Sequence, residues 1–288
     1  MSKPNKSSDA RLSELYENLS RYSYLLNRIK GKSPYTMHKP LQIPAEVQHL
    51  YMDKDKSHYL DDLVLIEADL PDNPRVLDAG CGFGGSIFRW HHLKPGIYHG
   101  MTLSNYQKKI AVKNAHRLGV EASCMFYIQN YLEPINIKYH GIMAVESLIH
   151  SLDLDATLAN FKQALLLKGK LVIVDDMSRD ERVRQEKEYQ LLKDYWYLKD
   201  LPSEMDYVEL LGKNNLKITS NLDLTPQIRF NSDQSLNKRI RKTKFLFRLM
   251  PIKSLRIFLK THLGGFALQK LYNKGLMKYQ LIVAERGA

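Results

Sequence analysis

The sequence predicts an α/β protein in which a largely parallel sheet is flanked by helices. Three observations predict this class. Short apolar runs typical of buried strands alternate with helical patterns, a glycine-rich turn joins the first such strand to a helix, and polar residues follow the ends of several later strands. At 288 residues the chain suits one large α/β domain with an elaborated cap, or two small domains.

Composition is that of an ordinary folded chain. The apolar fraction is 44%, and the two cysteines, Cys81 and Cys124, provide no disulfide framework. There is no run of 18 apolar residues, and the polar N-terminus lacks the apolar core of a signal peptide. We therefore expect a cytoplasmic protein without a transmembrane segment.

A strand and a glycine-rich turn at residues 75–86 (RVLDAGCGFGGS) form the most informative stretch. Glycines at this spacing let the backbone turn sharply and approach a nucleotide-like ligand, and the following helix N-terminus offers unpaired N–H groups. The pattern Gly80-x-Gly82-x-x-Gly85 also fits a dinucleotide fingerprint, which needs an acid about 20 residues further on. No Asp or Glu occurs between Asp78 and Glu121, so the sequence disfavours NAD.

The order Asp78-x-Gly80-x-Gly82 after an apolar strand resembles motif I of the class I S-adenosylmethionine (SAM)-dependent methyltransferases. The resemblance implies a Rossmann-like sheet of seven, mostly parallel strands, with helices on both faces and a helical cap. It also implies that the glycine turn, which contains Cys81, packs against the methionine part of the cofactor. Asp78 would then support this end of the site.

The second predicted strand, 98–103, and the residues after it indicate a particular subgroup of these methyltransferases. It runs into Thr102, Leu103, Ser104 and Gln107, a pattern similar to that of the tocopherol, sterol and prenyl-diphosphate C-methyltransferases and the cyclopropane-fatty-acid synthases. In that subgroup these positions meet the ribose of the cofactor. An amide offers both a donor and an acceptor, so Gln107 can serve a diol without a charge. Ser104 is also compatible with a plain helix cap.

The third predicted strand, 122–128, ends in Gln129, Asn130 and Tyr131. The resembling enzymes have an aspartate here that accepts a hydrogen bond from the adenine amino group. In this chain Asn130 or Gln129 would have to accept that bond through an amide oxygen. Tyr131 is placed to stack on the base, although a core aromatic is an equally good interpretation.

The first 70 residues are expected to form a helical lid. Residues 1–10 have a disordered composition, a helical pattern covers 11–29, and 45–70 should supply a helix that packs against the sheet. In the resembling methyltransferases an N-terminal helix and a tyrosine-rich link close over SAM. The matching candidates are Tyr22, Tyr24, Tyr35 and His38, for which ordinary packing is the competing interpretation.

The fourth predicted strand, 141–145, leads into Glu146 and His150, which the resemblance places beside the sulfonium at the carboxyl edge of the sheet. For a hydroxyl or amine acceptor, His150 is the expected general base, because an imidazole titrates near neutrality. For an alkene carbon, Glu146 would stabilise the carbocation and His150 would remove the proton. The alternative is that Glu146 binds SAM and His150 only satisfies a backbone carbonyl.

The net charge of +12 is concentrated near the C-terminus, where residues 232–274 carry eleven Lys and Arg against Asp233 alone. Apolar residues interleave with these cations, so we expect a cap over the acceptor pocket. Its apolar side chains suit a lipophilic molecule, and its cations suit an anionic group, a membrane surface or only solvent. The expected organisation is a lid at 1–70, a SAM-binding core at 71–180, further core elements with the basic cap at 181–276, and the last strand at 277–288.

These expectations converge on a SAM-dependent methyltransferase of a lipophilic small molecule, such as an isoprenoid or another secondary metabolite. O- or N-methylation is the alternative, and an RNA methyltransferase or nucleic-acid-binding module is a remote one, because no RNA-binding signature is present. No metal is expected, since His91 and His92 lack a further ligand at metal spacing. A homo-oligomer is compatible with the sequence.

Overall fold

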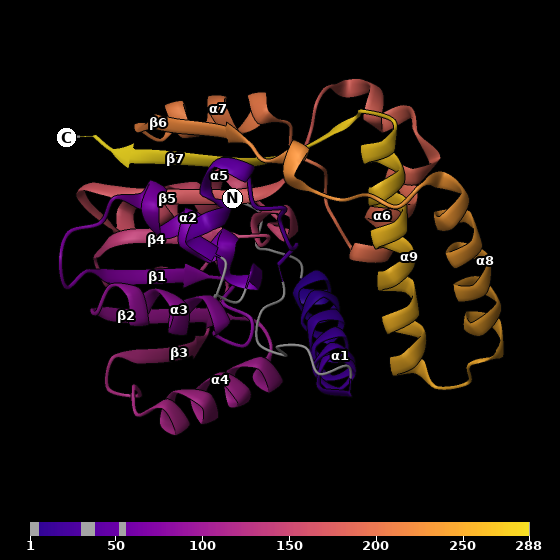
Figure 1. Cartoon of the computed structure of the whole chain (residues 1–288), viewed down its shortest axis with the longest axis horizontal. Coiled ribbons are helices and arrows are strands. Elements are labelled where there is room, and N and C mark those ends of the chain that lie inside the picture. Colours follow the sequence, from indigo (N-terminus) through magenta and orange to yellow (C-terminus); the bar gives the residue numbers. More distant parts are fainter. Residues whose placement is uncertain (1–5, 30–37, 52–55, 288) are drawn as a thin grey trace.

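A seven-stranded sheet in the order β3-β2-β1-β4-β5-β7-β6 forms the centre of the molecule (Figure 1). The computed structural model describes residues 6–29, 38–51 and 56–287. Neighbouring strands from β3 to β5 are parallel, whereas β7 is antiparallel to both β5 and β6. The prediction of a Rossmann-like, mostly parallel sheet is confirmed. The strands are β1 (Arg75–Ala79), β2 (Ile97–Thr102), β3 (Cys124–Ile128), β4 (Tyr139–Val145), β5 (Leu165–Ser178), β6 (Leu216–Asp223) and β7 (Met277–Arg286).

Side chains of the central strands alternate between two hydrophobic cores, one on each face of the sheet. Val172 and Val174 of β5 belong to one core, and Leu171 and Ile173 to the other. The first core is closed by α2, α3, α4, α6 and α9, and the second by α5 and α7. Helices therefore cover both faces, as predicted.

The helices differ from the expectations in two places. The first begins at Lys6, inside the segment expected to be disordered, and the region expected as one helix at 45–70 contains short 3-10 turns at 45–51 and 56–58 before α2. The helices are α1 (Lys6–Ile29), α2 (Tyr59–Ala68), α3 (Gly85–Leu93), α4 (Asn105–Leu118), α5 (Leu154–Ala164), α6 (Lys187–Trp196), α7 (Glu204–Lys213), α8 (Asp233–Leu249) and α9 (Lys253–Asn273).

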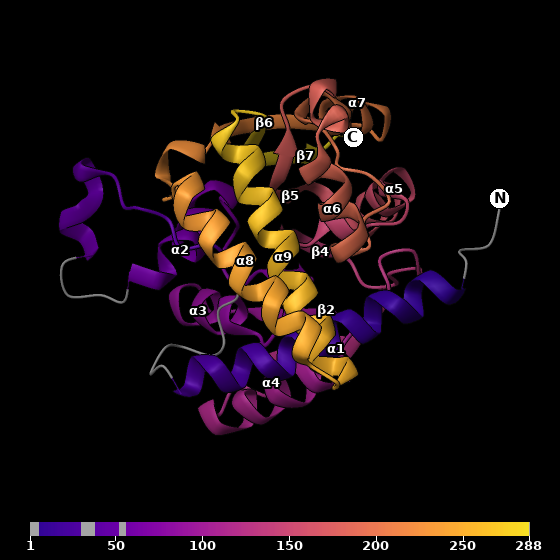
Figure 2. The same ribbon diagram turned by 90° about the vertical axis from the view of Figure 1, so that its right-hand side faces the viewer.

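A helical layer lies beyond the carboxyl ends of the parallel strands. The basic segment forms α8 and α9, which pack against each other, and α9 also contacts α6 and α1 (Figure 2). The carboxyl ends of the parallel strands and these helices thus enclose a space at the edge where open α/β sheets place their ligands. Within the described ranges, every helix is too short or too polar to cross a bilayer.

Candidate active site

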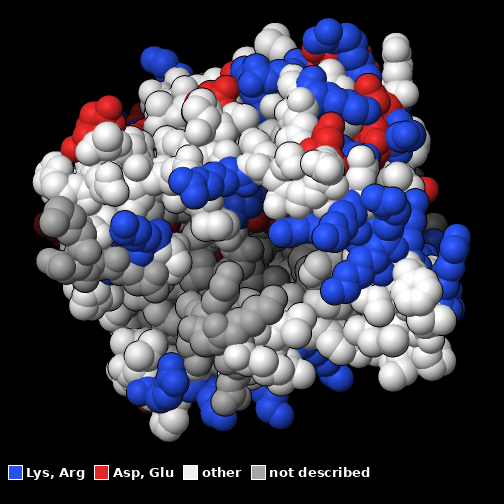
Figure 3. All heavy atoms as spheres, turned by 45° about the vertical axis from the view of Figure 1, so that its right-hand side comes forward, with Lys and Arg blue, Asp and Glu red and all other residues white. Residues whose placement is uncertain are grey.

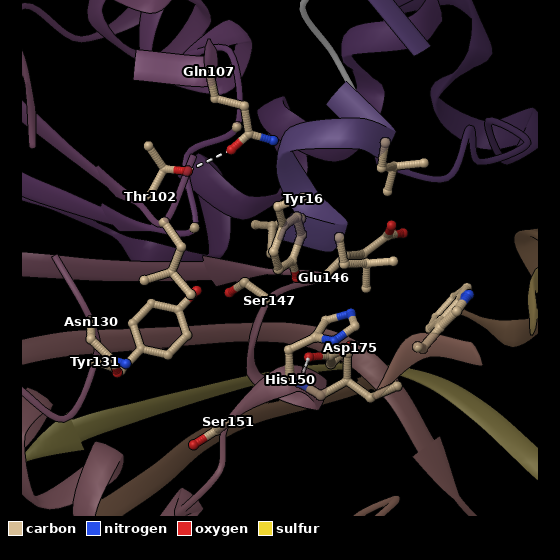
Figure 4. Close-up of a pocket in the computed structure, with 18 of the residues that line it drawn as sticks. Tyr16, Thr102, Gln107, Asn130, Tyr131, Glu146, Ser147, His150, Ser151 and Asp175 are labelled. Carbon is tan, nitrogen blue, oxygen red and sulfur yellow. Dashed lines mark hydrogen bonds between the residues drawn. The ribbon is translucent and has the colours of Figure 1, made fainter. Parts of the chain in front are cut away.

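A cavity of about 260 Å³ opens at the carboxyl ends of the parallel strands, between the sheet and α1 (Figure 4). It brings together residues from four separate sequence segments that were predicted to form one site. Those in its lining are Gly80, Gly82, Thr102, Leu103, Gln107, Gln129, Asn130, Tyr131, Glu146 and His150. His38, a candidate for the lid, also lines it.

Four predicted site residues lie outside this lining. Asp78 is buried behind the glycine turn, where burial, with the nearby charge of Asp61, raises its pKa to about 8. Cys81 is buried as well, and burial raises the pKa of its thiol. The Tyr22 hydroxyl lies 2.9 Å from Ser254 Oγ on α9.

The fourth of these, Ser104, caps α4 by accepting a hydrogen bond from the backbone N–H of Gln107 at 3.2 Å. Tyr35, which was predicted to bind the cofactor, falls outside the described residues. Tyr24 packs its ring 5.4 Å from the ring of Phe83, centroid to centroid. Ser104 and Tyr24 therefore do not line the cavity.

The glycine turn is held tightly against the end of β4. Gly80 has φ of +99°, and a Cβ at this position would lie 2.5 Å from Ser147 Cβ and 2.7 Å from the Tyr131 hydroxyl. Ser147 Oγ donates a 2.6 Å hydrogen bond to Ala79 O, which ties the two strand ends together. Both the dihedral angle and the close approach therefore require glycine at position 80.

The end of β2 and the start of α4 carry a chain of polar contacts to α1. Thr102 Oγ1 donates to Gln107 Oε1 at 2.5 Å, and Gln107 Nε2 donates to Ser20 Oγ at 2.8 Å. Ser104 Oγ donates to Glu17 Oε2 at 2.6 Å. The first turn of α4 contains no acidic residue, and Glu17 of α1 places its carboxylate there instead. A negative charge at this position suits the positive end of the helix dipole.

The pKa of Glu17 responds to these contacts. Burial raises it, but the hydrogen bonds from the Ser104 hydroxyl and the Tyr106 backbone N–H leave it below its ordinary value. Neither Glu17 nor Ser20 was identified from the sequence, because nothing in a helical pattern shows which turn of α1 meets α4.

The end of β3 supplies the third wall. Asn130 Oδ1 accepts a 3.0 Å hydrogen bond from Leu132 N, and Gln129 Nε2 donates to Pro134 O at 3.1 Å. The ring of Tyr131 meets that of Phe161 edge to face, with centroids 5.8 Å apart. Tyr131 therefore packs into the core with one edge while it lines the cavity.

Glu146 occupies a strained backbone conformation at the end of β4, with φ of +50°. Its Oε1 accepts hydrogen bonds from Lys39 N at 2.9 Å, Lys39 Nζ at 3.3 Å and the Tyr279 hydroxyl at 2.8 Å. Burial raises the pKa of Glu146, but the Lys39 ammonium and these hydrogen bonds outweigh it and lower the pKa overall. Glu146 is therefore held as a carboxylate.

Two aspartates at the end of β5 complete this wall. Asp176 accepts hydrogen bonds from Lys39 Nζ at 2.7 Å and from the Tyr272 hydroxyl at 2.5 Å. Asp175 accepts from the backbone N–H of Ile149 at 2.8 Å, and its burial beside Asp176 raises its pKa to about 8. The strand-end rule that located Glu146 would also have located this pair, whereas nothing in the sequence indicated Lys39.

His150 lies in a buried aromatic setting. Its ring centroid is 5.3 Å from that of Tyr16 and 5.9 Å from that of Trp196, and its Nδ1 has no hydrogen-bond partner among the described residues. Burial lowers the pKa of His150 to about 4. The expected titration near neutrality was wrong, because among the described residues desolvation of the imidazolium outweighs its hydrogen bond with the Trp196 backbone. Tyr16 and Trp196 were missed in the sequence, where they read as ordinary apolar helix positions.

A second cavity, of about 540 Å³, adjoins the first and shares Lys39, Glu146 and Trp196 with it. Its lining is mainly apolar and includes Phe230 and Tyr272, whose rings stack with centroids 4.5 Å apart. The other residues around it are Pro40, Leu41, Gln42, Ile228, Arg229, Gly265, Leu268 and Gln269. Helix α9 contributes Gly265, Leu268, Gln269 and Tyr272 to this cavity, and among the described residues the lining cations are Lys39 and Arg229.

Part of the sequence is similar to known methyltransferases, and so is the fold of the whole chain. No family model matches the chain. An O-methyltransferase of Penicillium expansum is 30% identical over 105 residues, which are 36% of this chain and 38% of that protein. An O-methyltransferase of Pyrenophora dematioidea is 31% identical over 105 residues, 35% of this chain and 38% of that protein. The matches thus span well under half of these relatives.

Solved structures resemble the chain over nearly its whole length. A geranyl diphosphate methyltransferase in complex with geranyl diphosphate and sinefungin has a TM-score of 0.74, 19% identity and coverage of 98% of this chain and 100% of that one. The geranyl diphosphate C-methyltransferase of Streptomyces coelicolor, in complex with Mg²⁺, geranyl diphosphate and S-adenosyl-L-homocysteine, has a TM-score of 0.72, 17% identity and coverage of 99% and 100%. The chain therefore has the fold of these methyltransferases.

Proposed function

We propose that the protein is a SAM-dependent methyltransferase that methylates a lipophilic small molecule. The observation that carries this proposal is the cavity at the carboxyl edge of the sheet, which joins the glycine turn, the Thr102–Gln107 pair and Tyr131 to Glu146 and His150. The fold shared with methyltransferases and the two partly matching O-methyltransferases support it.

The chemistry of the lining fits SAM. The hydroxyl and amide of Thr102 and Gln107 would hold the ribose diol, and Tyr131 with the amides of Gln129 and Asn130 would hold the base. The turn at Gly80 would face the amino-acid end, where the backbone approaches closely. When bound, SAM supplies an activated methyl group on a sulfonium.

The second cavity is the proposed acceptor site. It meets the first at Lys39, Glu146 and Trp196, so an acceptor held there would reach the SAM cavity beside the Glu146 carboxylate. Apolar side chains dominate its lining, which suits a lipophilic body, and Arg229 suits a polar or anionic end.

The neutral protonation state of the His150 imidazole favours methylation of carbon. An imidazole with a pKa of about 4 is neutral at physiological pH and is a weak base. A carbocation formed on methylating an alkene is acidic enough to lose a proton to such a base, and the Glu146 carboxylate would stabilise the positive charge before that loss.

Methylation of oxygen is the second candidate, and the two curated relatives favour it. In this case His150 is poorly matched to a neutral hydroxyl, because its conjugate acid is much stronger than an alcohol. We therefore propose that an oxygen acceptor would arrive already ionised, as a phenolate or carboxylate.

The test is an incubation with methyl-labelled SAM and fractionated lipophilic extracts, followed by mass spectrometry of the products. A labelled product supports the proposal, and NMR of that product distinguishes a new C–CH₃ from an O–CH₃. Glu146→Gln should lose the product, whereas Glu121→Gln, at an exposed site on the loop after α4, should retain it. Identical label in the wild type and Glu146→Gln would contradict the assigned role of Glu146.

A further inference from the structure

We propose that the outer face of α8 is a docking surface for anionic lipid bilayers. This face is unusual in exposing large apolar side chains in the middle of a cationic helix. Phe245 is 62% exposed and Leu249 is 59% exposed, and Ile252, just beyond the helix end, is 56% exposed. Apolar side chains so exposed are unfavourable in water unless something covers them.

Helical spacing places cations on either side of this apolar strip. Lys238, Arg241 and Lys242 precede Phe245 by seven, four and three positions, and Arg248 follows it by three, so all four lie on the same side of the helix. On the inner side of α8, Leu236 is buried and the ring of Phe247 meets α9, with the Arg256 guanidinium carbon 4.6 Å from the ring centroid. The helix thus has an inner apolar stripe for packing and a second, cation-flanked apolar strip outside.

The cations of this outer face have no carboxylates to neutralise them. No Asp or Glu occurs between Asp233 and Glu285 in the sequence. Within the described part of the chain, none of the four forms an ion pair with an acidic side chain, unlike Lys253 at the start of α9, whose Nζ lies 2.6 Å from Glu14 Oε1. Figure 3 shows a dense cluster of Lys and Arg side chains on the right of the view, beside a hollow in the surface.

The positive charge and the exposed apolar side chains together favour an anionic bilayer as the partner of this face. An anionic bilayer offers phosphate and carboxylate headgroups to the cations and an acyl boundary to Phe245, Leu249 and Ile252, which is the pattern of helices that lie in a membrane interface. A nucleic acid would use the cations but leave the three apolar side chains in water. A second copy would bring the same positive charge against itself.

Docking through α8 would bring the acceptor cavity near the bilayer. The segment before α8 contributes Arg229 and Phe230 to that cavity, and α9, on which α8 packs, contributes Leu268 and Tyr272. A lipophilic acceptor dissolved in the membrane would thereby be available beside the cavity. This consequence rests on the proposed function, whereas bilayer binding by itself does not.

The experiment is co-sedimentation of the full chain with vesicles of phosphatidylcholine alone and of phosphatidylcholine with phosphatidylserine, at physiological and at high salt. We expect binding to the anionic vesicles only, and weakening by salt. Phe245→Ser with Leu249→Ser, and separately Lys238→Glu with Lys242→Glu, should each weaken binding at least about tenfold. The matched control, Lys109→Glu with Lys113→Glu on the exposed side of α4, removes the same charge elsewhere and should change binding less than threefold.

Several results would overturn the proposal. They are no binding to the anionic vesicles at physiological salt, equal weakening by the α4 control, and retention of binding after the Phe245 and Leu249 changes. A salt-dependent shift of nucleic acid without vesicle binding, or a stable dimer whose formation the α8 substitutions abolish, would assign the face to those partners instead. Circular dichroism of each variant checks that it is folded, and failure of SAM binding would leave the vesicle result unaffected.

Discussion

Lys39 Nζ lies 2.7 Å from Asp176 Oδ2 and 3.3 Å from Glu146 Oε1, so one ammonium joins the ends of β4 and β5. The tyrosine hydroxyls of Tyr272 and Tyr279 donate to the same two carboxylates. Both cavities reach this cluster, so it forms the junction between the proposed cofactor and acceptor sites.

Removing the Lys39 ammonium should destabilise the fold strongly. Lys39→Met would leave two close, largely buried carboxylates without their shared cation, and breaking a buried pair in this way typically costs about 3–5 kcal/mol. Urea unfolding of the apo protein at neutral pH measures the loss. The control is Lys94→Met, whose partner Asp72 is exposed and whose loss should cost less than about 1 kcal/mol. Equal losses of unfolding free energy in the two variants would contradict the claim that Lys39 stabilises the fold by neutralising both carboxylates.

Alanine at position 80 should weaken both the fold and cofactor binding. The positive φ of Gly80 alone makes a side chain cost about 1–3 kcal/mol, and the new Cβ would push against Ser147 and the Tyr131 hydroxyl. Gly212→Ala in α7 has open space around its Cβ and should be neutral or stabilising by about 0.5 kcal/mol. Thermal unfolding with and without S-adenosylhomocysteine separates the two effects. A Gly80→Ala protein with wild-type ligand-induced stabilisation would disprove the link between this turn and the cofactor.

The pH dependence of activity should not show His150 titrating with the pKa of a free histidine. Burial lowers the pKa of His150 to about 4. A free imidazole has a pKa of about 6.5 and would titrate over roughly pH 5.5 to 7.5, whereas the His150 ring stays neutral throughout this range. The kcat/KM profile should therefore contain no step from His150 across that range, and a step that persists in His150→Gln would belong to another group of the lining, such as His38. A loss of activity on the acid side with an apparent pKa near 6.5, absent in His150→Gln, would show that the imidazole is solvated and the assignment of its state is wrong.

The stability of the apo protein should fall with rising pH through Asp175. Its folded pKa of about 8 lies above the unfolded value, so between these values the folded chain holds one more proton than the unfolded chain. The stabilisation is complete below the unfolded pKa and is lost as pH rises toward 8. Relative to Asp175→Asn, the wild type should lose about 1.4 kcal/mol per pH unit in this window. Urea unfolding at several pH values tests this, with the exposed Asp72→Asn as a control that keeps the wild-type slope.

Contiguous motifs made much of the fold and site predictable. The glycine turn, the Thr102–Gln107 segment and the start of the β4 loop each follow a strand, and strand ends converge by topology. Lys39 and Asp176 are 137 positions apart, and the contact of Glu17 with Ser104 spans 87. No periodicity encodes such contacts, because they depend on how α1 and the segment around Lys39 pack against the rest of the chain.

The neutral state of His150 was unpredictable for a related reason. Its pKa follows from Tyr16 and Trp196, which come from α1 and α6 and exclude water from the ring. A sequence shows that a histidine follows a strand, but burial by distant helices decides whether it carries a charge.

The measurement that tests the account most directly is isothermal titration of S-adenosylhomocysteine into the wild type, Gly82→Arg and Gly212→Arg. We predict saturable heat at one site for the wild type and for Gly212→Arg, and none for a folded Gly82→Arg, because the new side chain would fill the cavity that Gly82 lines. Absence of heat from the wild type, or saturable heat from NAD in its place, would contradict the claim that this cavity holds a sulfonium nucleoside.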